Sequence, residues 1–520
     1  MRRTICAVLA FLSTCLSVGA TPATAAGKVP AQFFAKLYSE ALGRMPDPSG
    51  WSAAVGDFAA KGCTPDRVRD FARGFYTSAE FMALNYDAEE RVLALYRDAL
   101  NREPDRSGFD HFTGLLTEGA RSWPQIVDAI VSSGELASLA ATICGSSTSY
   151  HYGTAPALTL TPKGAGFAGG TGEQLQALLD ATPEGGTVYL AEKAVVRVGA
   201  MLVIPPGRTL ATTGTPSPRE YARQGRLVRA SSFGEPVVRL QSGARLRGVW
   251  VDGQRGAYTN FTLNAINVQL MGGDGTEVSG SKISDSRGWS SLLALGSGDN
   301  RPCPRAVISG NLVTAYSSEH VMHDGVGRWT DGISVSCENA VVEGNGIVDA
   351  TDVGIVLFRS SPATQRSSVQ GNVVLNAGNA AYGAIVVDPL YGGDVTHDFT
   401  GATVSGNAFW TGPDTHADIG IAAGTRMWFG ERADDGAGVS VRDNTTNGLT
   451  AVVGTGIAVG GMNRATVQGN DLRLSVRAIS SCPHVNFGVD QEGHAQDGDF
   501  QPGATPVDFT NPSGGGCIGH

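Results

Sequence analysis

Short apolar strands that end in a polar corner recur along the second half of the chain. Each begins with a Val-rich segment, as in AVVEGNGIV, and reaches Gly-Asn or Asp-Asn before the next apolar residues. The phrase recurs at six asparagines, 26 to 37 residues apart: Asn311, Asn345, Asn372, Asn407, Asn444 and Asn470. A second phrase, glycine followed by aliphatic residues, comes after most of them: at Gly332, Gly354, Gly383, Gly420 and Gly456. Such an interval is typical of stacked coils joined by loops of variable length.

This pattern predicts a parallel β-helix from residue 165 to residue 520. Strands of one coil pair with strands of the next about 4.8 Å away, so unpaired edges remain only at the two ends. Alternate Val, Ile and Leu side chains then point inward. We expect each asparagine to adopt the left-handed conformation at a corner and to hydrogen-bond along its stack, and glycine to relieve crowding. A β-sandwich would instead show hairpin turns about every 8–12 residues.

The first part of the chain has helical spacing and an internal repeat. LYSEALGRMPDPSGW, from Leu37 to Trp51, returns as LYRDALNREPDRSGF, from Leu95 to Phe109. The pattern predicts a small all-α domain over residues 27–146, in which tandem units bury each other's apolar faces. The motif resembles a helical domain-of-unknown-function family of secreted bacterial proteins. The repeated Arg and Asp of each unit either tie the helix end to the turn or bind a ligand: Arg44, Arg102, Asp47 and Asp105.

Residues 1–26 have the pattern of a secretory signal, with Arg2 and Arg3 before an apolar core, and residues 147–164 are expected to be a linker. We therefore expect a secreted, extracellular protein, and the resemblance of the helical domain implies that it is bacterial. Without the signal six cysteines remain, and an even number in an exported chain favours disulfides. Pairing of sequence neighbours predicts Cys63–Cys144, Cys303–Cys337 and Cys482–Cys517. The formal net charge of -10 argues against nucleic acid or an anionic membrane as partner.

Two stretches of the predicted β-helix resemble known families. A helix around Leu175–Leu179 followed by GGTVYL resembles the N-terminal cap of pectate-lyase-like proteins. WTDGI at Asp331 and ATDVGI at Asp352, 21 residues apart, resemble the Asn-Thr-Asp-Gly and Asp-Asp elements of the polygalacturonase group. The Gly-His-Gly and Arg-Ile-Lys elements of that group are not apparent. The resemblance implies a mainly β protein that folds as a right-handed parallel β-helix. It also implies that the protein cleaves glycans, as other families with this scaffold do.

The acids before these glycines are the candidate catalytic groups. Asp331 and Asp352 are expected one coil apart and about one residue out of line, with backbones roughly 6 Å apart. Hydrolysis of a glycosidic bond needs one protonated and one ionised carboxyl group. We assign Asp352 as acid and Asp331 as base, with Asp388 or Asp349 as substitutes. Residues expected to bind the sugar are Trp329, His323, Glu319, Arg328, Arg359, Tyr382, Tyr391 and Trp428.

Other interpretations of these residues remain open. Asp-Gly is also a common turn, and Asp349 also suits an Asx turn at a corner. Three functions fit the pattern: a glycoside hydrolase, a polysaccharide lyase or epimerase, and a non-catalytic glycan-binding surface protein. The expected partner is a polysaccharide or oligosaccharide, and no membrane span is predicted after the signal. A hydrolase of this kind needs no cofactor or metal, whereas a lyase often uses Ca²⁺.

Overall fold

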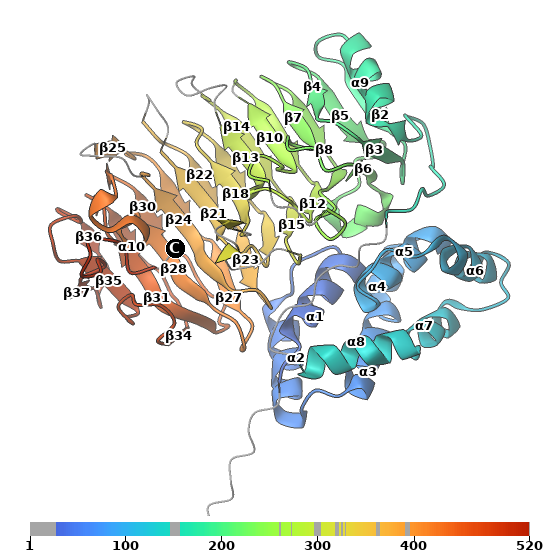
Figure 1. The fold of residues 1–520 in the computed structure, drawn as a ribbon, viewed down its shortest axis with the longest axis horizontal. Coiled ribbons are helices and arrows are strands. Elements are labelled where there is room, and N and C mark those ends of the chain that lie inside the picture. Colours follow the sequence, from blue (N-terminus) through green and yellow to red (C-terminus); the bar gives the residue numbers. More distant parts are fainter. Residues whose placement is uncertain are drawn as a thin grey trace, which may run out of the picture.

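The computed structural model describes residues 28–145, 156–258, 262–271, 273–295, 303–317, 322–323, 326–327, 329–359, 364–390 and 396–518, with only the backbone described at 322–323 and 326–327. A helical domain lies against the side of an elongated β-helix (Figure 1). The predicted fold class, a parallel β-helix preceded by a small all-α domain, is therefore confirmed. The predicted signal at 1–26 lies outside the described residues.

The helical domain contains two copies of the repeated unit. Asp47 and Asp105 cap the helices that follow them by accepting from the backbone N–H of Gly50 and Gly108, at 2.8 and 2.9 Å. Arg44 pairs with Glu80 and Arg102 with Glu135, so all four repeated residues serve the helix ends. The helices are α1 (Ala31–Lys36), the π-helical η1 (Leu37–Ala41), α2 (Pro48–Lys61), α3 (Pro65–Tyr76), α4 (Ala79–Ala83), α5 (Ala88–Ala99), α6 (Arg106–Thr117), α7 (Trp123–Val131) and α8 (Gly134–Gly145).

Helix length and hydropathy do not give a membrane span in the described part of the chain. No helix there passes both criteria alone, although α7 and α8 pass together if the 57° bend between them is ignored.

Three long parallel sheets form the faces of the β-helix. The sheet that faces the helical domain has nine strands: β1 (Gly170–Thr171), β3 (Val195–Val198), β6 (Gly225–Arg229), β9 (Val249–Asp252), β12 (Lys282–Ser284), β15 (Leu312–Thr314), β20 (Gly346–Val348), β23 (Val373–Asn376) and β27 (Ala408–Thr411). The second sheet has eleven strands: β2 (Thr187–Leu190), β5 (Thr209–Thr212), β8 (Arg245–Arg247), β11 (Thr276–Ser279), β14 (Ala306–Ser309), β19 (Val341–Glu343), β22 (Ser368–Gln370), β26 (Thr403–Ser405), β30 (Ser440–Arg442), β33 (Thr466–Gln468) and β36 (Asp499–Phe500).

The third sheet, which we call the site sheet, has twelve strands. They are β4 (Leu202–Ile204), β7 (Val238–Leu240), β10 (Val268–Met271), β13 (Ser290–Leu295), β18 (Asp331–Val335), β21 (Val353–Phe358), β24 (Ala381–Asp388), β28 (Ala417–Ala423), β31 (Ala451–Val459), β34 (Leu474–Val476), β35 (Phe487–Asp490) and β37 (Thr505–Val507). Outside the three sheets lie α9 (Gly172–Ala181), η2 (Pro218–Arg223), α10 (Arg426–Phe429), η3 (Gly430–Arg432), the pair β16 (Met322–His323) and β17 (Val326–Gly327), and β25 (Thr396–Asp398), β29 (Asp435–Ala437) and β32 (Met462–Asn463).

The repeated asparagines form a continuous hydrogen-bonded ladder inside one corner. Asn345 Nδ2 donates to Asn372 Oδ1 at 2.9 Å and to the carbonyl of Ile308 at 2.9 Å, and the same pattern links all six asparagines. The predicted stack is confirmed, but the expected left-handed backbone of the asparagines is wrong. The residue before each asparagine adopts that conformation, as Gly344 does with a φ of 61°, because glycine lacks the Cβ that opposes it.

The glycines of the second phrase have a different role, which is to avoid steric clashes with the neighbouring coil and the interior side chains. A Cβ on Gly332 would lie 2.4 Å from the carbonyl oxygen of Gly354 and 2.6 Å from Ile347 Cγ2. At Gly354 the same atom would meet the carbonyl of Ala384 and Val374, both at 2.5 Å. Only glycine lets the site sheet pass this close to the interior side chains. Asp331 and Asp352, which precede these two glycines, are thereby held at fixed places in their coils.

A buried set of charged side chains joins the two domains. Glu40 of η1 pairs with Lys282 Nζ of β12 at 2.7 Å and with Arg97 Nε of α5 at 3.3 Å. Arg226 of β6 pairs with Glu103 at 2.7 Å and also with Asp252. All these side chains are at most 4% exposed, and Trp250 of β9 stacks against the guanidinium groups of both arginines.

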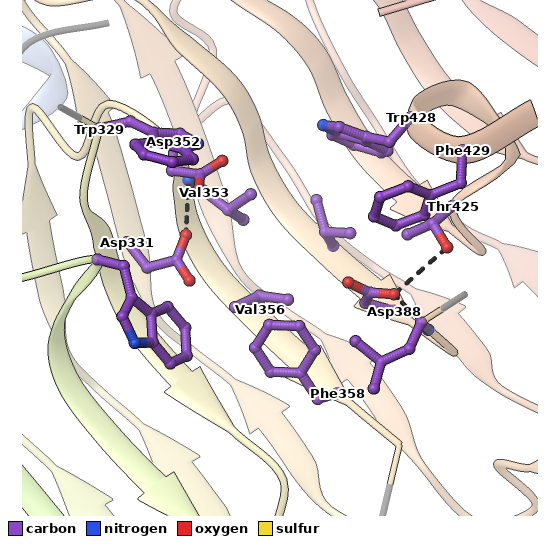
Figure 2. A pocket seen from close by; sticks show the side chains of 13 residues that line it. Trp329, Asp331, Asp352, Val353, Val356, Phe358, Asp388, Thr425, Trp428 and Phe429 are labelled. Atoms are coloured by element: carbon purple, nitrogen blue, oxygen red, sulfur yellow. Dashed lines mark hydrogen bonds between the residues drawn. The ribbon is translucent and has the colours of Figure 1, made fainter. Parts of the chain in front are cut away.

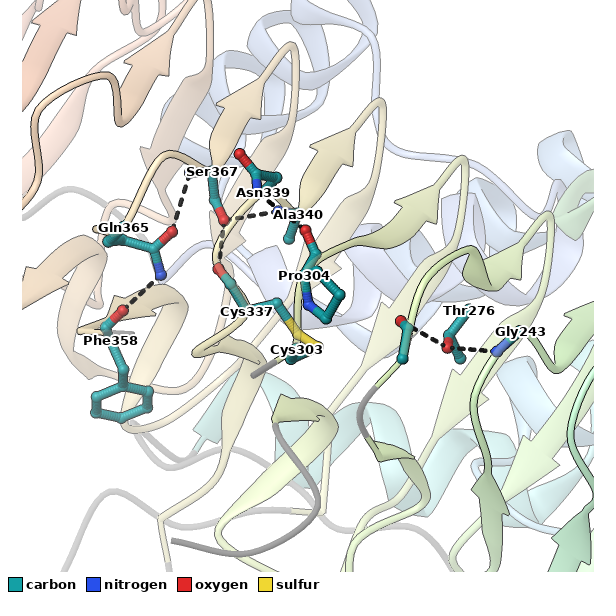
Figure 3. The surroundings of a disulfide bond; sticks show 11 residues. Gly243, Thr276, Cys303, Pro304, Cys337, Asn339, Ala340, Phe358, Gln365 and Ser367 are labelled. Carbon is teal, nitrogen blue, oxygen red and sulfur yellow. Dashed lines mark hydrogen bonds between the residues drawn. A yellow bond between two sulfur atoms is a disulfide. The ribbon is translucent and has the colours of Figure 1, made fainter. Parts of the chain in front are cut away.

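The three predicted disulfides are confirmed: Cys63–Cys144, Cys303–Cys337 and Cys482–Cys517. Figure 3 shows the second of them beside the turn that follows β18. The carbonyl of Cys337 accepts from Ser367 Oγ at 2.8 Å, and Gln365 links this turn to the carbonyl of Phe358 at 2.8 Å. Hydrogen bonds through Ser367 and Gln365 therefore connect the disulfide to Phe358 at the end of β21.

Candidate active site

The strand register brings Asp331 and Asp352 to neighbouring coils. Ile333 of β18 lies opposite Ile355 of β21, so Asp331 lies opposite Val353 and Asp352 is one residue out of line. This is the offset that the two Asp-Gly phrases predicted. The backbone N–H of Val353 donates to Asp331 Oδ1 at 3.0 Å, which couples the first carboxylate to the coil of the second.

A pocket of about 340 Å³ opens over this part of the site sheet (Figure 2). Asp331 and Asp352 lie at one end of it, and Asp388, at the end of β24, lies at the other. The two ends are separated by Val356 and Phe358 of β21. The remaining lining residues are Trp289, Trp329, Val353, Val386, Leu390, Thr425, Trp428 and Phe429.

Asp331 is buried and holds two hydrogen bonds. Besides the Val353 N–H, it accepts from Ser334 Oγ at 2.7 Å, and Ser334 in turn contacts Ser290 Oγ at 2.8 Å. Burial raises the pKa of Asp331 to about 7, helped by the charge of Asp388, although both hydrogen bonds favour the ionised form. The group therefore changes charge near neutral pH.

Asp352 has a different environment. It is partly exposed to the pocket, and its carboxyl group accepts no hydrogen bond from the described residues. Burial, followed by the charges of Asp331 and Asp388, raises its pKa well above the ordinary value. Because nothing described here stabilises its ionised form, Asp352 is the member of the pair that keeps the proton.

Asp388 has neighbours that partly offset the effect of burial. Its Oδ1 accepts from the Leu390 N–H at 2.5 Å and from Thr425 Oγ1 at 3.3 Å. Burial raises the pKa of Asp388 to about 6, while these two donors and the charge of Arg359 oppose the rise. At neutral pH this carboxylate faces the Asp331–Asp352 pair across the pocket.

Asp349 does not belong to the pocket. It lies at a corner with a φ of 57°, wholly buried below the helical domain. Gln32 Nε2 of α1 donates to it at 2.6 Å, and the backbone N–H groups of Ala377, Gly378 and Asn379 donate to its other oxygen. Its role is to tie the domains together, so it is removed from the set of candidate catalytic groups.

The predicted sugar-binding residues divide into three groups. Trp329 and Trp428 line the pocket. Tyr382 belongs to the same apolar cluster as Trp428 and Val353 but does not line the pocket, and Arg359 lies beside Asp388 but outside the lining. The remaining candidates lie outside the described residues or have no described side chain: Glu319, Arg328, Tyr391 and His323.

Sequence reasoning missed eight lining residues: the aliphatic Val353, Val356, Val386 and Leu390, and also Trp289, Phe358, Thr425 and Phe429. The Asp331 N–H donates to the carbonyl of Trp289 at 2.7 Å. Trp289 therefore holds, directly before β13, the same place that Thr330 holds directly before β18. Aligning GWSSLLAL with WTDGISV would have found it. Phe358 lies opposite Asp388. Thr425 and Phe429 come from the short α10, which no repeated phrase marks.

No group of three or more His, Cys, Asp or Glu side chains among the described residues is arranged to hold a metal ion. The described lining of the pocket presents carboxyl groups, aromatic rings, aliphatic side chains and the hydroxyl group of Thr425. Such a set can donate and accept protons and can stack on a sugar ring.

Comparisons with known proteins concern the two domains separately. Residues 72–140 match the model of DUF4214, a domain of unknown function, which agrees with the helical repeat. A search of curated proteins finds no match.

Among solved structures, the Dettilon tailspike protein superposes with a TM-score of 0.38 at 16% identity, over 64% of this chain and 61% of that one. Endo-xylogalacturonan hydrolase from Aspergillus tubingensis gives 0.39 at 14% identity, over 65% of this chain and 95% of that one. Alginate lyase from Paenibacillus sp. gives 0.31 at 13% identity, over 59% and 99%. The match thus spans about three fifths of the tailspike chain.

Proposed function

We propose that the protein is an exported glycoside hydrolase whose catalytic groups are Asp352 and Asp331. The observation that carries the proposal is the pocket itself, in which two carboxyl groups on adjacent coils have different hydrogen-bond environments. Glycosidic hydrolysis needs this difference, because one group must give a proton while the other takes one. The three disulfides support an oxidising, extracellular location.

Asp352 is the general acid in this proposal. It gives its proton to the glycosidic oxygen as the bond from that oxygen to the anomeric carbon breaks. Asp331 takes a proton from the water whose oxygen bonds to the anomeric carbon, so one water is added and no other reactant is needed. Asp388, ionised across the pocket, stabilises the positive charge that develops on the sugar ring.

The lyase alternative has no lysine base among the described lining residues of the pocket. A lyase or epimerase removes a proton next to a carboxyl group, usually with Lys, Arg or His. Lys282 is the only lysine after Lys193, and it is fully buried and paired with Glu40, on the face toward the helical domain. It cannot reach the pocket, which opens on the site sheet. The described lining residues include no other basic group.

The proposal is tested on a panel of polysaccharides with Asp331→Asn, Asp352→Asn and wild type, with products separated by chromatography. Each substitution should lower the rate by about 10²–10⁴, whereas Asp443→Asn, an exposed corner acid outside the pocket, should leave it unchanged. Unsaturated products, seen by ultraviolet absorbance, would assign the protein to the lyases. Binding of glycans without any product from the wild type would leave only the glycan-binding function.

A further inference from the structure

The walls of the pocket are mainly apolar. Five aromatic side chains and four aliphatic ones surround it: Trp289, Trp329, Phe358, Trp428 and Phe429, with Val353, Val356, Val386 and Leu390. Among the described lining residues, the side chains that can accept from carbohydrate hydroxyl groups are the three acids and Thr425. A fully hydroxylated sugar buried here would leave part of its polar surface against rings, which costs free energy unless it is paired.

The pocket also has no described cation to meet a negative charge. Arg426 begins α10 beside the lining residue Thr425, but its side chain turns away and is 3% exposed. Its Nε lies 2.7 Å from Asp490 Oδ2, and its terminal nitrogen lies 3.2 Å from Glu492. Arg359 lies near Asp388 and is not among the residues that line the pocket.

Resting on the proposed function, we propose that the pocket binds a neutral sugar residue with a methyl group at C6, that is, a 6-deoxyhexose, and excludes uronic acids. The methyl group packs against the aromatic wall, while the ring hydroxyls donate to the carboxylates. The specificity-determining residues are Phe358, Phe429 and Trp428, together with the acids they surround.

Two physical effects set the order of affinity. A uronate carboxylate placed within about 6 Å of a buried carboxylate would bind about 100-fold more weakly at an effective dielectric constant near 20. A hydroxymethyl group differs from methyl by one hydroxyl group. Apolar pockets reject such a hydroxyl only modestly, by about 10- to 100-fold. The expected order is therefore 6-deoxyhexoside, then hexoside, then uronide.

The test compares sugars that differ only at C6. Methyl glycosides of fucose, galactose and galacturonic acid form one such series, and those of rhamnose, mannose and mannuronic acid form another, each in both enantiomers. Binding is followed by quenching of tryptophan fluorescence, since Trp289, Trp329 and Trp428 line the pocket. This measurement needs no turnover. Loss of all hydrolysis with the binding order retained would overturn the proposed function and keep this inference.

A charge-gain variant makes the test sharper. Phe429 is partly exposed, so Phe429→Arg should fold and should strengthen uronide binding at least 10-fold, with Phe429→Leu as the control without charge. Trp329→Arg, also at a partly exposed position, is the second variant if the first is unstable by circular dichroism. Uronides that bind the wild type as tightly as 6-deoxyhexosides would refute the inference. So would the absence of binding by every glycoside in both series at millimolar concentration.

Discussion

Replacement of Glu40 by glutamine should reveal how strongly the two domains are joined. Glu40 is fully buried and meets Lys282 of the β-helix and Arg97 of the helical domain. The substitution keeps the shape of the side chain and removes its charge, so both cations stay buried without this partner. Breaking a buried ion pair from one side typically costs about 3–5 kcal/mol.

The pKa of Glu40 gives a second measure of the same effect. Burial alone would raise this pKa, but the charges of Lys282 and Arg97 outweigh burial and lower it from 4.5 to about 2. A shift of that size corresponds to about 3 kcal/mol in favour of the folded state. Since the folded pKa is the lower one, this stability is present above about pH 4.5 and is lost as the pH falls toward 2.

The assay is urea denaturation at pH 7 and at several values down to pH 3, followed by both fluorescence and circular dichroism, because two domains need not unfold together. Glu40→Gln should be about 3 kcal/mol less stable at pH 7, and the difference should narrow with acid. Burial lowers the pKa of Lys282 to about 8, so the unpaired ammonium is costly, and Glu40→Gln with Lys282→Met should regain part of the loss. A single variant within about 0.5 kcal/mol of wild type at pH 7 would refute the reasoning.

Three further outcomes follow from individual contacts. Ser334→Ala removes a donor to Asp331 and should shift the acid limb of the pH–rate profile up by about one unit, because hydrogen bonds to charged groups are worth about 1.5–3 kcal/mol; an unmoved limb would contradict Asp331 as the base. Gly354→Ala should lower the urea midpoint, by about 2 kcal/mol in stability, since its Cβ would lie 2.5 Å from Ala384 O. The control Gly56→Ala, which meets nothing within 4 Å in α2, should instead stabilise by about 0.5–1 kcal/mol. Asn372→Leu interrupts the ladder at Asn345 and Asn407 and should cost about 2–3 kcal/mol by equilibrium denaturation; equal stability would mean that water replaces the amide.

The fold could be predicted because its physical requirements repeat. Successive coils from Asn311 to Asn470 carry the same buried amide, and most of them carry the same small residue, so Asn345 and Gly354 mark their coils in the sequence as they do in space. The detail that failed was local. The left-handed conformation belongs to Gly344 and its equivalents, because the asparagine side chain must point inward to reach the next amide.

The site was predictable only where it follows the repeat. Asp331 and Asp352 precede repeated glycines, and the register fixes their offset. In the sequence Asp349 resembles the other two candidate acids. In the structure, however, Gln32 of a helix 317 residues earlier donates to its carboxylate. No local sequence pattern contains that contact. Thr425 and Phe429 lie at the two ends of α10, a helix that does not recur from coil to coil. No sequence periodicity therefore marks them.

The helical domain and the pocket lie on different faces of the β-helix. Helices cover the sheet that contains Trp250 and Lys282, whereas the pocket opens on the sheet that contains Asp331. Anything anchored by the helices would consequently hold the pocket at a constant angle and distance from the anchoring surface. The distance that the protein reaches along a polymer would then depend on where it is attached, because buried ion pairs of Glu40 and Arg226 join the two domains.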